Sequence, residues 1–134
     1  MARLAIYTEP GETPSQILDE AGQLGGALDR ICAEREGRHV LVRVVNEFND
    51  ELMVGLGPKA GAVTITLAFG EAVYNALGDG EFGKSEAKVN FEWAGQRFEM
   101  EPEKLLPVAE ARKIVEKWMK DRVRDESVKW EVCN

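Results

Sequence analysis

Residues 40–69, VLVRVVNEFNDELMVGLGPKAGAVTITLAF, contain three apolar runs separated by two turn signals. The runs are 40–45, 51–57 and 62–69. The first is rich in β-branched residues, which favour strands. Asn49-Asp50 and the segment Pro58-Lys59-Ala60-Gly61 supply residue types that favour turns. We therefore expect a central strand followed by a hairpin.

The chain on the C-terminal side of this stretch continues with strand patterns. Residues 71–77 are a further strand candidate, and a glycine-rich loop follows at 78–85. In 86–93 apolar and polar residues alternate, which is typical of a half-buried strand. A tight turn at 94–95 and a returning strand at 96–101 complete a second predicted hairpin.

A first helix is predicted on the N-terminal side, after a strand at 3–8. Thr13 and Pro14 are typical of a helix start, and Gln16 completes a capping box. Apolar residues then recur with helical spacing at Ile17, Ala21, Leu24, Leu28 and Ile31. Three glycines, at 22, 25 and 26, weaken this helix and predict a break or fraying in its middle.

A second helix is predicted near the other end of the chain. Pro107 suits its first turn, and the apolar face comprises Val108, Ala111, Val115, Trp118 and Met119. A short strand at 128–132 follows and carries Trp130. The element order predicts an α+β fold, a largely antiparallel β-sheet with two helices packed on one face. The length of 134 residues fits a single domain over 1–134.

The net charge of −7 is concentrated in the middle of the chain. Eleven acids and four bases lie between Asn46 and Glu103, so this stretch accounts for the whole imbalance. An acidic surface repels nucleic acid and speeds encounter with a basic protein. A surface kept acidic for solubility is the alternative interpretation.

The loop Gly78–Ser85 matches the phosphate-binding pattern G-x-x-x-x-G-K-[ST]. That mechanism requires a loop that leads from a strand into a helix, so that free amides face the phosphates. Here the following segment alternates with period two, and Asp79 and Glu81 place negative charge in the loop. We therefore interpret it as a hairpin loop.

Candidate catalytic and metal-binding groups are sparse in the sequence. His39 is the single histidine, and the two cysteines, Cys32 and Cys133, are expected to be reduced thiols. Nothing singles out a carboxylate pair or a nucleophile, so we expect no enzyme, no metal and no cofactor. No apolar stretch suits a membrane helix or a signal peptide, which predicts a cytoplasmic protein without a membrane partner.

The strand and tail patterns resemble an immunity protein family of bacterial polymorphic toxin systems, the first in that series. The runs Glu51–Leu56 and Gly61–Leu67 are similar to the family core "eLxVGv…gxGxLxy". The hairpin Val89–Gly95 followed by Phe98 resembles the segment "vxYxxxG…f". The tail pattern is carried by Pro107, Ala111, Val115, Trp118, Val128, Trp130 and Glu131. The similarity covers about residues 40–132, although Glu99 stands where the family often has proline.

The resemblance implies a cytoplasmic protein that binds the C-terminal domain of a cognate toxin, often a deaminase, and occludes its active site. Such a toxin is commonly basic near its active site, so acidic side chains are the expected contacts. The candidate toxin-binding residues are Asp79, Glu81, Glu86, Glu92, Trp93, Glu99 and Glu101. Trp93 also fits a core position at the end of its strand. The alternative function is a non-enzymatic adaptor or secretion chaperone.

Overall fold

The computed structural model describes residues 4–8, 13–35, 37–48, 50–58, 60–66, 73–78, 89–93, 95–121 and 128–133. Its strands are β1 (Leu4–Tyr7), β2 (Gln16–Leu18), β3 (His39–Asn46), β4 (Glu51–Leu56), β5 (Ala62–Thr66), β6 (Val73–Leu77), β7 (Asn90–Trp93), β8 (Gln96–Glu99) and β9 (Lys129–Cys133). Its helices are the 3-10 turns η1 (Ala21–Gln23) and η3 (Pro102–Lys104) and the α-helices α1 (Leu24–Glu34) and α3 (Val108–Asp121).

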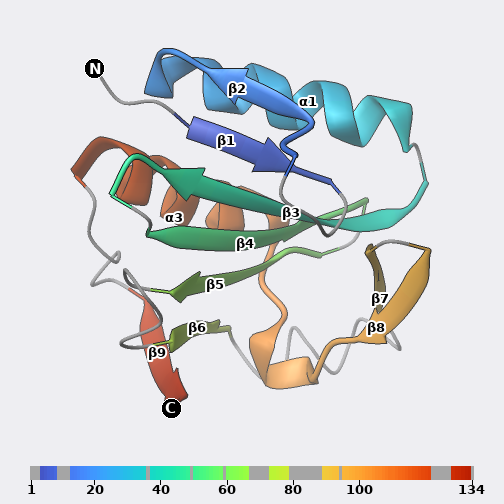
Figure 1. The fold of residues 1–134 in the computed structure, drawn as a ribbon. Coiled ribbons are helices and arrows are strands. Elements are labelled where there is room, and N and C mark those ends of the chain that lie inside the picture. The colour runs from blue at the N-terminus through green and yellow to red at the C-terminus, as the bar shows by residue number, and fades with distance from the viewer. Residues whose placement is uncertain are drawn as a thin grey trace.

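The nine described strands form one sheet, in which seven follow the order β2-β1-β3-β4-β5-β6-β9 (Figure 1). Every neighbouring pair in this path is antiparallel. The turns predicted at 49–50 and 58–61 join two of these pairs, β3–β4 and β4–β5. β7 leaves this pattern, because it runs parallel to the start of β3 and pairs with β8 as a hairpin. The predicted α+β class with a largely antiparallel sheet is confirmed.

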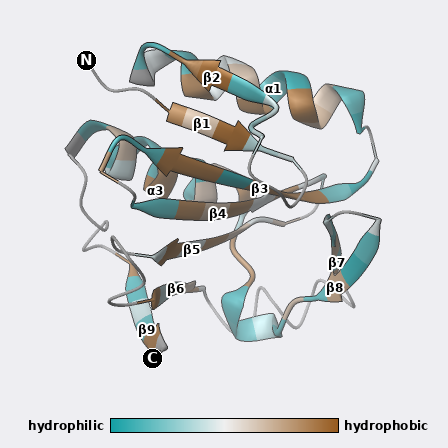
Figure 2. Cartoon of the chain, in the orientation of Figure 1, coloured by the Kyte–Doolittle hydropathy of each residue, from teal (hydrophilic) through white to brown (hydrophobic). Residues whose placement is uncertain are grey.

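The two faces of the sheet follow from the period-two alternation along each strand. Val42, Val54 and Ile65 point to the face that α1 and α3 cover, where they form one buried cluster with Leu28 and Ile114. Both described helices therefore pack on one face, as predicted, and both lie behind the strands in Figure 1. Figure 2 shows apolar residues along the central strands β3, β4 and β5 and hydrophilic ones on β8 and η3.

The prediction of a helix that starts near Thr13 was wrong in its first part. Gln16–Leu18 forms strand β2 instead, and its register places Leu18 opposite Leu4 of β1. The Ser15 N–H donates to the Ile6 carbonyl at 2.7 Å, which closes the chain back onto β1. These contacts with β1 lie outside the local sequence pattern, and they outweigh the helical spacing of the apolar residues.

The second half of that prediction is confirmed, since α1 begins at Leu24 and buries Leu24, Leu28 and Ile31. Ile17, a member of the predicted stripe, is instead 55% exposed. The residue before α1 is Gln23, whose side chain makes no capping hydrogen bond.

The second helix agrees with its prediction. The Pro107 carbonyl accepts hydrogen bonds from the amides of Glu110 and Ala111, at 3.0 and 3.1 Å, so the helix begins directly after the proline. Ala111, Val115 and Trp118 are buried in the main cluster. Trp130 of β9 is partly buried against the same cluster.

Candidate protein-binding surface

The β7–β8 hairpin is anchored by Phe91 on the face of the sheet opposite α1 and α3, which we call the opposite face. Phe91 is fully buried, and its ring meets the His39 ring edge-on, with 5.4 Å between centroids. Gly55 makes room for it, because a Cβ at that position would lie 2.6 Å from Phe91 Cε1. Ala62 and Leu105 belong to the same small buried cluster. This cluster fixes the hairpin to one end of the sheet.

Two of the candidate contact residues, Glu92 and Trp93, are built into this hairpin. The Glu92 carboxylate pairs with Arg38 at 3.5 Å and with Arg97 at 3.9 Å, and its side chain is only 24% exposed. Trp93 is half-buried beside the turn at Gly95, whose φ of 78° is the region that favours glycine. Glu92 thus has cationic partners already, whereas Trp93 is partly exposed.

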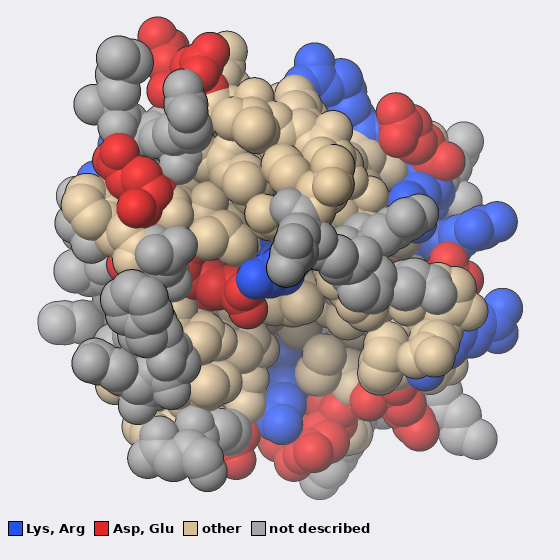
Figure 3. All heavy atoms as spheres, viewed as in Figure 1, with Lys and Arg blue, Asp and Glu red and all other residues tan. Residues whose placement is uncertain are grey.

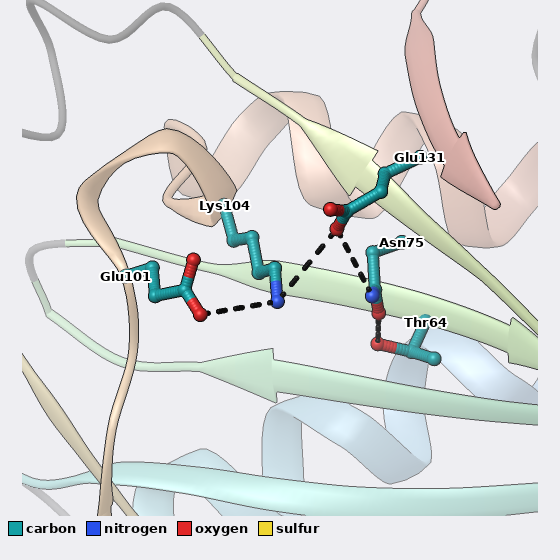
Figure 4. A network of polar contacts seen from close by, with 5 residues as sticks. All are labelled: Thr64, Asn75, Glu101, Lys104 and Glu131. Carbon is teal, nitrogen blue, oxygen red and sulfur yellow. Dashed lines mark hydrogen bonds and ion pairs between the residues drawn. The ribbon is translucent and has the colours of Figure 1, made fainter. Parts of the chain in front are cut away.

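Four exposed carboxylates lie on β8, on η3 with the residue before it, and on β9. We call this surface the acidic edge; its members are Glu99, Glu101, Glu103 and Glu131. Lys104 Nζ lies 3.6 Å from the Glu101 carboxylate and 3.7 Å from that of Glu131 (Figure 4). The lysine therefore bridges η3 to β9 and holds two carboxylates near each other.

A hydrogen-bond relay continues from Glu131 across the sheet. The Asn75 amide donates to Glu131 Oε2 at 3.5 Å, and the Thr64 hydroxyl donates to Asn75 Oδ1 at 2.6 Å. Figure 4 shows these side chains pointing toward one another from β5, β6 and β9. The register supports the relay, because Thr64 pairs with Asn75 and Asn75 pairs with Glu131. The position of the Glu131 carboxylate is thus set by the sheet.

The charge state of Glu103 is also set by its surroundings. Two hydrogen bonds lower the pKa of the Glu103 carboxyl below its ordinary value. The bond to its own backbone amide has the larger effect, and the bond with the Glu101 side chain has the smaller one. The charge of Lys104 acts in the same direction. Glu103 is fully exposed, so this carboxylate stays ionised and hydrated at neutral pH.

The rest of the opposite face carries fewer charged side chains than the acidic edge. Arg43 lies over the Tyr7 ring at 4.8 Å and pairs with Glu51 at 2.5 Å, so its charge is compensated within the sheet. Figure 3 looks onto this face and shows many uncharged atoms near its middle, with acidic side chains along its lower edge and also at its upper left and upper right. A polar, charged rim beside less charged area is the arrangement common in protein interfaces.

The structure brings four of the seven predicted contact residues together. Glu92, Trp93 and Glu99 lie on the hairpin, and Glu101 follows it directly. The other three, Asp79, Glu81 and Glu86, lie outside the described residues, as does most of the phosphate-loop pattern. Sequence reasoning missed Lys104 and Glu131, because their meeting depends on the pairing of β6 with β9.

Among the described residues, no three His, Cys, Asp or Glu side chains are grouped so as to hold a metal ion. Within the described residues, no buried side-chain nitrogen or oxygen lacks a hydrogen-bond partner. No described helix is both long and apolar enough to cross a membrane.

No protein-family model, no curated protein and no solved structure matches this chain. The function is therefore argued from the described residues and from the sequence patterns. The acidic edge and the hairpin that carries Trp93 are the features that bear on it most directly.

Proposed function

We propose that this chain is a non-enzymatic immunity protein of the cytoplasm, which binds the C-terminal domain of a cognate toxin and occludes its active site. The observation that carries the proposal is the acidic edge, where Glu99, Glu101, Glu103 and Glu131 are all exposed. The sequence resemblance to an immunity protein family is the second, independent support.

The acidic edge suits a basic partner for electrostatic reasons. Its carboxylates are solvated in the free protein, and Lys104 compensates only part of their charge. Complementary charge steers diffusional encounter and raises association rates by about 10- to 1000-fold. A toxin that acts on nucleic acid presents a basic groove to phosphates, and these carboxylates would take the place of the phosphates.

Aromatic residues on the hairpin supply the apolar part of such an interface. Phe98 is 43% exposed on β8, and Trp93 is half-buried on β7. Large aromatic side chains that become buried on binding often carry most of the affinity, while the surrounding charges set rate and orientation. A complex of ordinary stability would bury about 1,600 Å² in total.

Co-expression with the toxin-like C-terminal domain encoded by a neighbouring gene tests the proposal. We expect cells to survive only when both proteins are made, and the two to co-purify as a 1:1 complex. Cell death without a complex contradicts the immunity function for that toxin domain and favours the adaptor or secretion-chaperone alternative.

Charge reversal then tests the contact surface. The double variant Glu99→Lys, Glu103→Lys leaves the Lys104 ion pairs in place, because neither residue takes part in them. We expect the association rate constant at low salt to fall at least about tenfold, with an unchanged circular dichroism spectrum.

The matched control carries the same change of charge elsewhere. Glu20→Lys with Glu34→Lys alters two exposed carboxylates outside the acidic edge. If control and test variants slow association equally, net charge alone is responsible and the acidic edge is not the contact surface.

A further inference from the structure

A groove of about 580 Å³ lies between the start of α1 and the second half of α3. Gly22 and Gly25 line one side, and side chains of α3 line the other. We call this the interhelical groove. Because both helices pack on the other face of the sheet, this groove is separate from the opposite face and its small buried cluster.

Contacts within the chain do not explain why glycine stands at positions 22 and 25, on one side of the groove. A Cβ added at Gly22 or Gly25 would meet no atom within 4 Å, so neither glycine is required by packing. Neither has the positive φ that would require glycine, in contrast to Gly37 and Gly95. Glycine is also among the least favourable residues inside a helix, where Gly25 stands. A ligand that approaches the backbone closely would account for it.

The side of the groove that α3 forms is cationic, although the chain as a whole has a net negative charge. Lys113, Lys117 and Lys120 line it with a spacing of four and three residues, which places them on one side of α3. Within the described part of the chain, Lys113 and Lys120 have no carboxylate within 4.0 Å. Glu116 is the single acid among the lining residues.

The groove also has an apolar side chain in its lining. Met119 supplies it and is only partly buried against the main cluster. A smaller hollow shares Met119, Gly25 and Glu116 with the groove; its other lining residues are Leu24, Leu28, Val115 and Arg112. An apolar side chain beside the ammonium groups of Lys113 and Lys120 suits a ligand that combines negative charge with a large apolar side chain, rather than an inorganic anion.

We propose that the interhelical groove docks an acidic peptide segment of a partner protein, with one large apolar side chain of that segment resting on Met119. The seven-residue separation of Lys113 and Lys120 corresponds to about 10 Å along the helix, which matches about three residues of extended peptide. The peptide backbone passes the glycine side, where Gly25 permits close approach. This proposal does not rest on the immunity function, since it concerns a different surface and a partner of opposite charge.

Titration of the isotope-labelled protein with a short peptide of alternating glutamate and leucine, followed by nuclear magnetic resonance, tests the proposal. We expect chemical-shift changes confined to the start of α1 and the second half of α3. A peptide with lysine in place of glutamate is expected to produce none. Shift changes that fall mainly on β7, β8 or β9 would overturn the assignment.

Two variants and a control separate charge from shape. Lys113→Glu with Lys120→Glu is expected to weaken binding at least about tenfold. The control, Arg30→Glu with Lys129→Glu, changes two exposed residues outside the lining of the groove and is expected to change binding less than about twofold. Gly25→Leu fills the groove while favouring the helix, so we expect weaker binding together with a higher melting temperature.

Three further outcomes would overturn the proposal that the groove docks an acidic peptide. Equal affinity for the test and control variants overturns the proposal, as does an absence of binding by the peptide. Binding of inorganic tripolyphosphate at the groove without binding of the peptide overturns it in favour of a phosphate-bearing ligand.

Discussion

Arg112 Nη2 lies 2.5 Å from Asp29 Oδ1 and joins α3 to α1 at the surface of the helical layer. The Asp29 side chain is 68% exposed, so this ion pair contributes at most about 1 kcal/mol to stability. Both charges also act on the half-buried thiol of Cys32.

The thiol of Cys32 is expected to resist alkylation at neutral pH. Burial raises its pKa above the ordinary 9.0, Arg112 lowers it in part, and Asp29 raises it again. The reactive species is the thiolate, so the alkylation rate should climb only at a higher pH than for an exposed cysteine. In a Cys133→Ser background, Arg112→Ala should move this climb to still higher pH. The rate of iodoacetamide modification against pH measures both.

The same shift has a consequence for stability. Because the pKa is higher in the folded than in the unfolded chain, the folded state holds the proton more tightly. The contribution of the protonated Cys32 thiol to stability is complete below about pH 9. This contribution is lost as pH rises through the pKa of the folded state. Cys32→Ser should remove this decline in urea denaturation at alkaline pH, and an unchanged decline would contradict the assignment to Cys32.

Gly55→Ala and Gly26→Ala should change stability in opposite directions. A Cβ at Gly55 would lie 2.6 Å from the fully buried Phe91 ring, which must then move. Overpacking of this kind costs about 1–3 kcal/mol. A Cβ at Gly26 meets nothing within 4 Å, and alanine favours the helix by up to about 1 kcal/mol. Urea denaturation measures both, and equal changes would contradict the packing of Phe91 on Gly55.

The central strands could be predicted from sequence because their burial alternates within each segment. Val40, Val42 and Val44 all face the main cluster, as a period of two requires. The start of the first helix could not be predicted from sequence. Ile17 and Ala21 continue the apolar spacing of the helix by coincidence, although Ile17 lies in strand β2. Pairing of β2 with β1 decides that segment, and no local pattern encodes it.

Part of the candidate protein-binding surface could be predicted from sequence, and part could not. Glu99 and Glu101, two of the predicted toxin-binding residues, are exposed. The ion pair between Glu92 and Arg38 was not foreseen, because it depends on the parallel pairing of β7 with β3. Phe98 is 43% exposed, because within the described residues β8 has a strand neighbour only on its β7 side.

Removal of the Asn75 side chain should loosen the attachment of β9. Asn75 accepts from Thr64 at 2.6 Å and donates to Glu131 at 3.5 Å. Asn75→Ala leaves the Thr64 hydroxyl without this acceptor and should destabilise the fold by about 1–3 kcal/mol. Hydrogen exchange at the β9 amides should accelerate more than exchange at the β3 amides. Thr66→Ala, a half-buried residue on the same side of β5, is the control and should leave β9 exchange unchanged.

The neighbouring residues Ile17 and Leu18 distinguish the observed hairpin from a helix over the same segment. In strand β2 the side chain of Leu18 is 3% exposed and belongs to the main cluster, whereas Ile17 is 55% exposed. Leu18→Ala should therefore destabilise the protein by about 2–5 kcal/mol, and Ile17→Ala by less than about 1 kcal/mol. A helix with the apolar stripe Ile17, Ala21 and Leu24 would reverse this order, since it buries Ile17. Urea denaturation of the two variants, which differ only in the position of the truncation, decides between the two structures. A larger loss for Ile17→Ala would show that this segment is helical.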